Sequence, residues 1–311
     1  MARDVSPVKQ HDIPSGDAGV VPTLAELVAL RASAQGRRPR RVRHASAGQS
    51  PSLLRGRGME YAESREYTAG DDARHIDWRL TARTGRAHTK LFQAERERLS
   101  LVVADTAPAL YFGTRVRFKS VQAARAGAVA AWRAIGEGDR IAALRGSLRE
   151  PPVPPAGGAR GALRVLDALV RWYARPPDDD AGLATALDHA ARVLRPGARL
   201  LVLADVGSLD GIPRSRWTGL SLHAEVTVVL LTDPLETAPP QARLAFEAEG
   251  RRIELDLAAA AQRQRWHARF VAPVEAMLAE LPGRGVQVRT LASDMPSDAW
   301  LQPRLPAVLE S

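Results

Sequence analysis

The order of apolar and polar positions divides the chain into two parts. From Leu99 onward, short apolar runs alternate with longer segments of helical periodicity. Short runs of this kind predict buried strands, and the longer periodic segments predict helices. Strands that alternate with helices are typical of a mostly parallel sheet with helices on both faces. We therefore expect residues 96–311 to form a doubly wound α/β domain.

The apolar runs also predict where the strands of this domain end. The predicted strands are residues 99–105, 139–144, 198–205, 225–233 and 285–292; the predicted helices are residues 119–135, 162–173, 183–194 and 258–281, with one more after Pro296. A β-hairpin at residues 242–257 is predicted as a small β-rich insertion. Sites in open α/β sheets lie at the carboxyl ends of strands. Asp105 and Asp205 end two of the strands and therefore lie where a site is expected.

The residues before this domain form an N-terminal extension without regular alternation. Residues 1–21 are polar, aperiodic and contain Pro and Gly, which is typical of disorder. Residues 22–95 are predicted to be a second region. It begins with a helix capped by Thr23, continues as a basic linker, and ends in a module rich in Asp and Arg.

The positive charge of the chain is concentrated in that linker. The formal net charge is +9, and residues 31–57 hold eight arginines and no acidic residue. Such a segment could bind phosphate groups, so nucleic-acid binding through residues 31–57 is one alternative function. The segment has no interleaved aromatic residues and no recognisable nucleic-acid motif, and we therefore do not favour a nucleic-acid partner.

Composition excludes several classes of chemistry. The chain has no cysteine, which excludes disulfides, thiolate catalysis and Cys-ligated zinc. It has no apolar run of about 18 residues, so no membrane span is predicted. The first residues carry acids and prolines where a signal peptide needs an apolar stretch, and we expect a cytoplasmic protein. Phosphate-binding loops, nucleophile elbows and zinc-protease motifs are missing from the sequence.

The segment from Arg65 to Arg83 combines acidic, basic and aromatic residues at high density. Its characteristic residues are Arg65, Tyr67, Gly70, Asp71, Asp72, Arg74, Asp77, Trp78 and Arg83. Buried charges require partners, so we expect an ordered turn in which the carboxylates bind guanidinium groups and backbone N–H groups. The alternative is a carboxylate-based, metal-dependent hydrolase that uses Asp71, Asp72 and Asp77 together with Asp105. No catalytic residue is assigned in the favoured interpretation.

This segment resembles a known bacterial family. Together with Gly56, Gly58, Glu60 and Tyr61, its spacing is similar to that of the family catalogued as domain of unknown function 58. The resemblance extends to Asp233-Pro234-x-Glu236 and to the C-terminus. It implies a von Willebrand factor A-like domain and, as a partner, an AAA+ ATPase of the MoxR type. The family has no established catalytic activity.

The resemblance also implies a metal site, but this sequence lacks most of the residues that would bind the metal. Von Willebrand-type domains often hold Mg²⁺ through a D-x-S-x-S motif, a Thr in a later loop and a further Asp. Here the first motif reads Asp105-Thr106-Ala107-Pro108-Ala109, and the loop that corresponds to the Thr contains Asp180 instead. Only Asp105 and Asp205 remain, so we expect no cofactor, with weak Mg²⁺ binding as the alternative. Both aspartates are then expected to cap segments or accept backbone hydrogen bonds.

We therefore predict a non-enzymatic protein-interaction module. It would act with a MoxR-type AAA+ ATPase in the assembly or activation of client proteins, which the sequence does not identify. The hydrolase and the nucleic-acid binder stay as alternatives from other classes.

Overall fold

The computed structural model of the chain describes residues 19–35, 59–68, 70–94, 98–248 and 251–302. They belong to two compact units, one within Met1–Arg38 and Arg98–Ser311 and the other within Pro39–Glu97. This division differs from the expected boundary, because the first helix groups with the larger unit and not with the Asp/Arg module.

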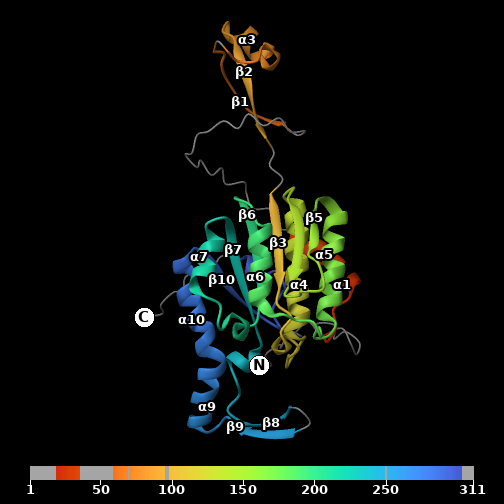
Figure 1. Cartoon of the computed structure of the whole chain (residues 1–311), viewed down its shortest axis with the longest axis vertical. Helices are drawn as coiled ribbons and strands as arrows, with labels where there is room; N and C mark the ends of the chain where they lie inside the picture. The colour runs from red at the N-terminus through yellow and green to blue at the C-terminus, as the bar shows by residue number, and fades with distance from the viewer. Residues whose placement is uncertain (1–18, 36–58, 69, 95–97, 249–250, 303–311) are drawn as a thin grey trace, which may run out of the picture. The chain divides into compact units, whose positions relative to one another are not determined.

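The larger unit is built on a six-stranded, mostly parallel sheet (Figure 1). Its strands, in spatial order, are β10 (Val286–Ala292), β7 (Ala224–Thr232), β6 (Ala198–Ala204), β3 (Leu99–Ala104), β4 (Arg140–Arg145) and β5 (Val153–Ala156). Only β5 pairs antiparallel within this sheet. It carries Pro154 and Pro155, which lack N–H donors and are tolerated because β5 is an edge strand. The strands that we predicted from the apolar runs are confirmed.

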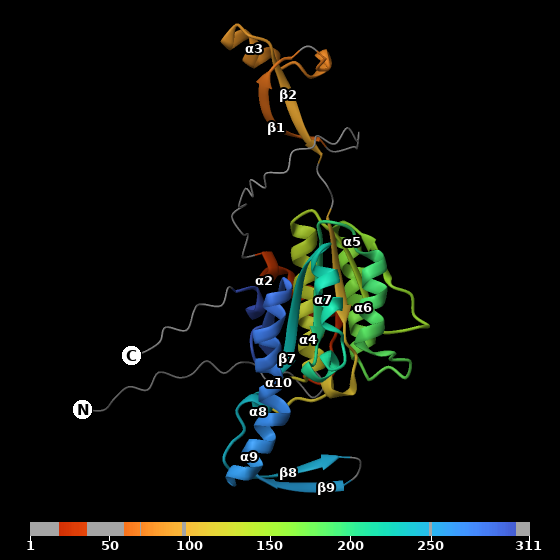
Figure 2. The ribbon, with the colours of Figure 1, turned by 60° about the vertical axis from the view of Figure 1, so that its left-hand side comes forward.

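Helices cover both faces of this sheet (Figure 2). On one face lie α1 (Leu24–Ala29), α2 (Arg31–Gln35), α4 (Lys119–Gly136) and α5 (Gly158–Tyr173); on the other lie α6 (Gly182–Val193), α7 (Arg214–Ser221) and α10 (Ala272–Glu280). Side chains of β3 alternate between the two layers: Val102 packs in the first and Val103 in the second. This confirms the α/β arrangement with helices on both faces.

The N-terminal helix α1 packs directly on the larger unit. Thr23 caps it by accepting a hydrogen bond from the Glu26 N–H at 3.3 Å. Leu27 is fully buried, and its carbonyl oxygen accepts a hydrogen bond from Trp132 Nε1 in α4 at 3.0 Å. Glu26 also forms an ion pair with Arg125 of α4. These contacts explain why α1 does not belong to the Asp/Arg module.

The predicted hairpin is present as β8 (Arg243–Ala248) and β9 (Arg251–Asp256). It follows the short helix α8 (Pro234–Thr237), and it precedes a continuous helical segment. That segment consists of α9 (Ala260–Trp266), a π-helical turn over His267–Val271, and α10. Of the helix expected after Pro296, the described residues contain one 3-10 turn over Ala299–Leu301, and residues 303–311 lie outside the described part of the chain.

The smaller unit is an antiparallel hairpin with short helices between its strands. β1 (Met59–Glu66) pairs with β2 (His88–Ala94). A 3-10 turn over Ala73–His75 and the helix α3 (Trp78–Thr84) lie between them in the sequence. In the parts of the chain described above, no helix is both long and apolar enough to cross a membrane.

Candidate functional site

Three aspartates follow adjacent strands at the carboxyl edge of the sheet. Asp105 follows β3, Asp205 follows β6, and Asp233 follows β7. β3 and β6 are neighbours in the sheet. The strand that follows β3 in the chain, β4, lies on one side of this pair, and the strand that follows β6, β7, lies on the other side. The edge between β3 and β6 is therefore a topological switch point, where ligands of open α/β sheets bind. The structure places the predicted aspartates at this point.

Asp105 is buried and uses its carboxylate to hold the loops around it. One oxygen accepts the Ala107 N–H at 3.0 Å, and the other accepts the Asp205 N–H, also at 3.0 Å. Burial raises the pKa of Asp105 to about 6, even though hydrogen bonds from Ser208 and the two backbone groups favour its ionised form. As predicted, this aspartate accepts backbone hydrogen bonds.

Lys119, the first residue of α4, lies against Asp205 and Glu236. Its Nζ is 2.7 Å from Asp205 Oδ2 and 2.6 Å from Glu236 Oε1, and the lysine side chain is only 1% exposed. Burial by itself lowers the pKa of Lys119, but the two carboxylates outweigh burial, so the pKa is raised. Burial and, to a smaller extent, the negative charge of Asp205 raise the pKa of Glu236 above its ordinary value, although the ammonium group lowers it.

A capping box orients Glu236 toward the lysine. Asp233 caps α8 by accepting the Leu235 N–H at 2.9 Å, and Glu236 Oε2 accepts the Asp233 N–H at 2.9 Å. The Asp233 carboxylate also accepts hydrogen bonds from the Thr114 hydroxyl and, at 2.7 Å, from Ser293 Oγ. Burial raises the pKa of Asp233, but these hydrogen bonds outweigh it and lower the pKa below its ordinary value.

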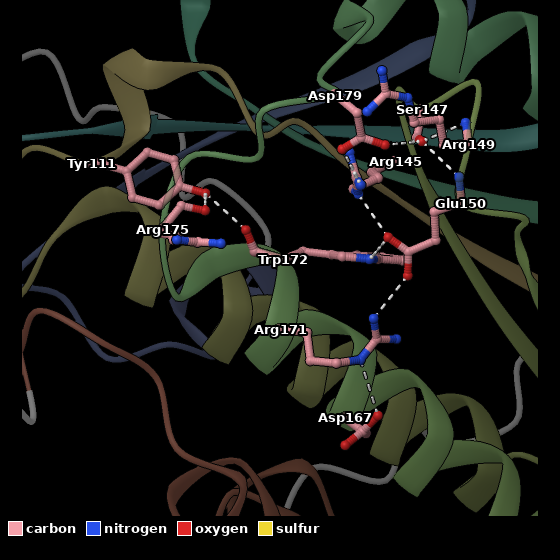
Figure 3. Close-up of polar contacts among 10 residues, drawn as sticks. All are labelled: Tyr111, Arg145, Ser147, Arg149, Glu150, Asp167, Arg171, Trp172, Arg175 and Asp179. Carbon is pink, nitrogen blue, oxygen red and sulfur yellow. Dashed lines mark hydrogen bonds and ion pairs between the residues drawn. The ribbon is translucent and has the colours of Figure 1, made fainter.

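A second polar cluster lies at the end of β4 (Figure 3). Arg145, whose side chain is 6% exposed, contacts Glu150 at 3.0 Å and Asp179 at 2.6 Å. Trp172 Nε1 donates to Glu150 at 2.8 Å, and Ser147 Oγ donates to Asp179 at 2.6 Å. Burial raises the pKa of Glu150, but the hydrogen bonds from Trp172, Arg171 and Arg145 outweigh it, so the pKa is lowered. This cluster ties the loop after β4 to the loop between α5 and α6.

Asp180, in the loop that the resemblance assigns to the missing Thr, lies close enough to Asp105 to raise its pKa. Its own carboxylate accepts the Gly182 N–H at 2.9 Å. Gly146 makes room for this loop, because a Cβ there would collide with the backbone oxygen of Gly182. Asp180 therefore holds the start of α6.

The oxygens at this edge are occupied by internal bonds. Asp205 Oδ1 accepts the Gly207 N–H at 2.9 Å, and Oδ2 accepts from Lys119. Mg²⁺ needs several oxygen ligands, and an ammonium group against Asp205 and Glu236 repels a second cation. The residues at this edge therefore do not fit a divalent cation. In the described ranges, no group of three or more His, Asp or Glu residues has the arrangement of a metal site.

In the smaller unit, the aspartates of the Arg65–Arg83 segment hold turns. Asp71 accepts the Thr68 N–H at 3.0 Å and pairs with Arg65 at 2.6 Å. The hydrogen bond from the Thr68 backbone is the main cause of a lowered Asp71 pKa, and Arg65 adds to it. The Tyr67 hydroxyl donates to the Asp71 carbonyl oxygen at 3.2 Å. Gly70, with φ at 109°, makes the turn in a conformation that favours glycine.

The other two aspartates of this segment cap helices. Asp72 accepts the Arg74 N–H at 3.0 Å at the start of the 3-10 turn. Asp77 caps α3 by accepting the Leu80 N–H at 3.1 Å, and Ser64 Oγ donates to its other oxygen at 3.0 Å. The hydrogen bond from the Leu80 backbone is the main cause of a lowered Asp77 pKa.

The expected set of Asp–Arg pairs is thus only partly present. The Asp71–Arg65 pair is formed, but the side chains of Arg74 and Arg83 are exposed and have no ion pair with any part of the chain that the structure describes. Trp78, a characteristic residue of this segment, is 69% exposed. A hairpin and one short helix offer too little surface within this unit to cover an indole ring.

The hydrolase and the nucleic-acid binder depend on other parts of the chain. The hydrolase would need Asp71, Asp72 and Asp77 in one cleft with Asp105. In the smaller unit, each of the three is bound to its own backbone neighbours, and a hydrolytic function stays an untested alternative. Most of the basic segment, residues 36–58, lies outside the described residues, so nucleic-acid binding stays a prediction.

Sequence reasoning missed Lys119 as a site residue. One signal could have found it: the chain has 44 basic residues, and only Lys9, Lys90 and Lys119 are lysines. In a chain that otherwise uses arginine, a lysine at a helix start stands out. Thr114 and Ser293, which bind Asp233, gave no comparable signal.

Comparison with known proteins supports the motif-based resemblance. A family model described as "Protein of unknown function DUF58" matches residues 63–274. Uncharacterized proteins of Mycobacterium bovis and of two strains of Mycobacterium tuberculosis are each 29% identical to the chain over 195 residues. This alignment covers 62% of the chain but only 61% of each relative, so the chain spans less than two thirds of their length. No solved structure matches the chain.

Proposed function

The chain belongs to the DUF58 family of proteins of unknown function, and from this premise we propose that it is a non-enzymatic protein-interaction module acting with a MoxR-type AAA+ ATPase. One observation carries the proposal. Beside the switch point of the sheet, where such folds bind ligands, the Lys119 ammonium lies between Asp205, which follows β6, and Glu236, which follows β7. A site whose charges are satisfied internally is suited to fixing the shape of a surface rather than to activating a substrate.

The arrangement of the sheet supports a von Willebrand factor A-like identity for the larger unit. β3, the first strand of that unit, lies at its centre beside β6, and the antiparallel β5 lies at one edge. In this proposal, the Lys119 ammonium supplies the positive charge that a bound Mg²⁺ supplies in related domains. Partner binding would then need neither a metal nor a partner carboxylate that completes a metal shell.

The carboxylates argue against a hydrolytic role in the same way. A general base must come within hydrogen-bond reach of a substrate proton. Both oxygens of Asp105, Asp205 and Glu236 accept hydrogen bonds from within the chain. The surface around them remains for contact with another protein. The choice of an AAA+ ATPase rests on the resemblance of the signature segment.

The test is a binding experiment with the full chain. The tagged protein is used to recover partners from its native host in the presence of ATP or a slowly hydrolysed analogue, and any AAA+ ATPase is then purified. We expect the purified ATPase to bind the chain in a nucleotide-dependent way, measured by biolayer interferometry. Recovery of no AAA+ ATPase, or no binding by the purified one, would refute the proposed partner.

A further inference from the structure

An apolar groove lies beyond the carboxyl edge of the sheet. It has a volume of about 480 Å³, and its walls come from the β8–β9 hairpin, α9 with its π-helical turn, and the loop after β3. Figures 1 and 2 show the hairpin beside α9 in both views. In the described part of the chain, no side chain fills this volume.

Aromatic side chains form the floor and walls of the groove. They include Phe112 from the loop after β3, Phe246 from β8, and Trp266 and Phe270 from the helical segment. The rings of Trp266 and Phe270 have centroids 4.5 Å apart, and those of Trp266 and Phe246 are 5.9 Å apart. Trp266 is buried, and the three phenylalanines are half-buried. Aromatic clusters of this kind are typical of the anchor points of protein interfaces.

The groove is attached rigidly to the ion cluster at the edge of the sheet. Glu236 lines the groove, its carboxylate binds Lys119, and its carbonyl oxygen accepts a hydrogen bond from Trp266 Nε1 at 3.0 Å. Trp266 is followed directly by the π-helical turn, a rare element that occurs frequently at functional sites. The groove is therefore a preformed part of the larger unit.

Two arginines give the groove its charge. Arg265 and Arg269, one helical turn apart, both line it, and both are exposed. Neither has an ion pair with any of the described residues. The carboxylate in the wall, Glu236, is already bound to Lys119. The groove therefore presents net positive charge next to an apolar surface.

We propose that this groove binds a segment of a protein partner that carries a bulky apolar residue flanked by Asp or Glu. The aromatic cluster would receive the apolar side chain, and Arg265 and Arg269 would bind the carboxylates. This inference rests on the proposed role in protein recognition, and it specifies the chemistry of the partner.

The inference is tested by selecting peptides from a random phage-displayed library on the full-length protein. We expect the selected peptides to combine Phe, Trp or Leu with Asp or Glu. Their affinity, measured by fluorescence polarisation, should fall at least tenfold for Arg265→Glu/Arg269→Glu. Arg164→Glu is the control, because Arg164 is exposed on α5 and lies outside the groove. Peptides with the acids replaced by lysine should regain affinity for the double variant.

Three results would overturn the inference: no selected peptide depends on Arg265 and Arg269, the selected peptides lack acidic residues, or a single-stranded oligonucleotide displaces them from the groove.

The outcome is separable from that of the proposed function. If the purified ATPase binds the double variant and the wild type equally, the groove is not its binding site, although the ATPase partnership stands. If groove peptides bind but no ATPase does, the groove stands and the partner is wrong.

Discussion

The Lys119 ammonium lies 2.7 Å from Asp205 Oδ2, and the lysine side chain is almost completely buried. Removing charges from water is costly, so such a pair persists only when its geometry is good and further hydrogen bonds are made. Glu236 supplies the second contact, and the capping box of α8 holds Glu236 in place. The pair therefore ties the start of α4 to the ends of β6 and β7.

Replacing the lysine should destabilise the fold strongly. In Lys119→Met, Asp205 and Glu236 lose their counter-charge in a buried site, which we expect to lower the free energy of unfolding by about 3–5 kcal/mol. Urea unfolding followed by circular dichroism measures this. The triple variant Lys119→Met/Asp205→Asn/Glu236→Gln, which removes all three charges, should recover much of the loss. A loss below about 0.5 kcal/mol in the single variant would show that the ion pair is dispensable.

Removing the ammonium group of Lys119 should allow divalent cations to bind between the carboxylates. In Lys119→Ala, the carboxylates of Asp205 and Glu236 face an open space that a hard cation can enter. We expect Mn²⁺ to raise the melting temperature of this variant and to bind it saturably in calorimetry. The wild-type protein should show no saturable site at millimolar or lower Mn²⁺. A micromolar site in the wild type would refute the role that we assign to Lys119.

The stability of the protein should carry a pH dependence from Asp105. Its pKa is about 6 in the fold against an ordinary value of 3.8, so between these pH values the native state binds more protons at this group than the unfolded state does. Its contribution to the free energy of unfolding therefore falls as the pH rises, by up to about 3 kcal/mol. We therefore expect the difference in the free energy of unfolding between the wild type and Asp105→Asn to decrease as the pH rises. Urea unfolding at each pH measures this difference. A constant difference from about pH 4 to pH 7 would contradict it.

In the smaller unit, Asp77 and its neighbour Trp78 should respond differently to truncation. Asp77→Ala removes the cap of α3 and should accelerate amide hydrogen exchange at Leu80, whose N–H the carboxylate accepts. Asp77→Asn, which can still cap, should restore slow exchange. Trp78→Ala should change the free energy of unfolding by no more than about 0.5 kcal/mol, because the side chain is exposed. A larger loss in Trp78→Ala would mean that the indole is buried against another surface.

The assignment of α1 to the larger unit can be tested with two neighbouring residues. Leu27 is fully buried, and Leu27→Ala should lower the free energy of unfolding by about 2–5 kcal/mol through loss of contacts and formation of a cavity. Val28 in the same helix is 37% exposed, and Val28→Ala serves as the matched control with a much smaller effect. Equal effects in chemical denaturation would show that α1 does not pack on α4 and α5.

The sequence by itself determined the α/β class, the strands and the candidate edge of the sheet. Apolar periodicity is a local property. It predicted each of the strands β3, β6 and β7, and with them the position of the aspartate that follows each strand. The capping role of Asp105 could also be predicted, because Ala107 and Ala109 stand where the metal motif has serines, and the Ala107 backbone N–H remains as a donor. The family could be identified for a similar reason, since its signature lies within one short segment.

The tertiary structure alone decided what neutralises those aspartates. Lys119 is 86 residues from Asp205 and 117 from Glu236, so no local pattern relates them. The same holds for the groove, whose aromatic residues come from a loop, a hairpin and a helix that meet only in the fold. Trp78 is a further case: an indole is a large apolar group, but the hairpin and short helix around it leave it exposed. Ion pairs and grooves depend on which distant segments meet, whereas periodicity depends only on neighbours along the chain.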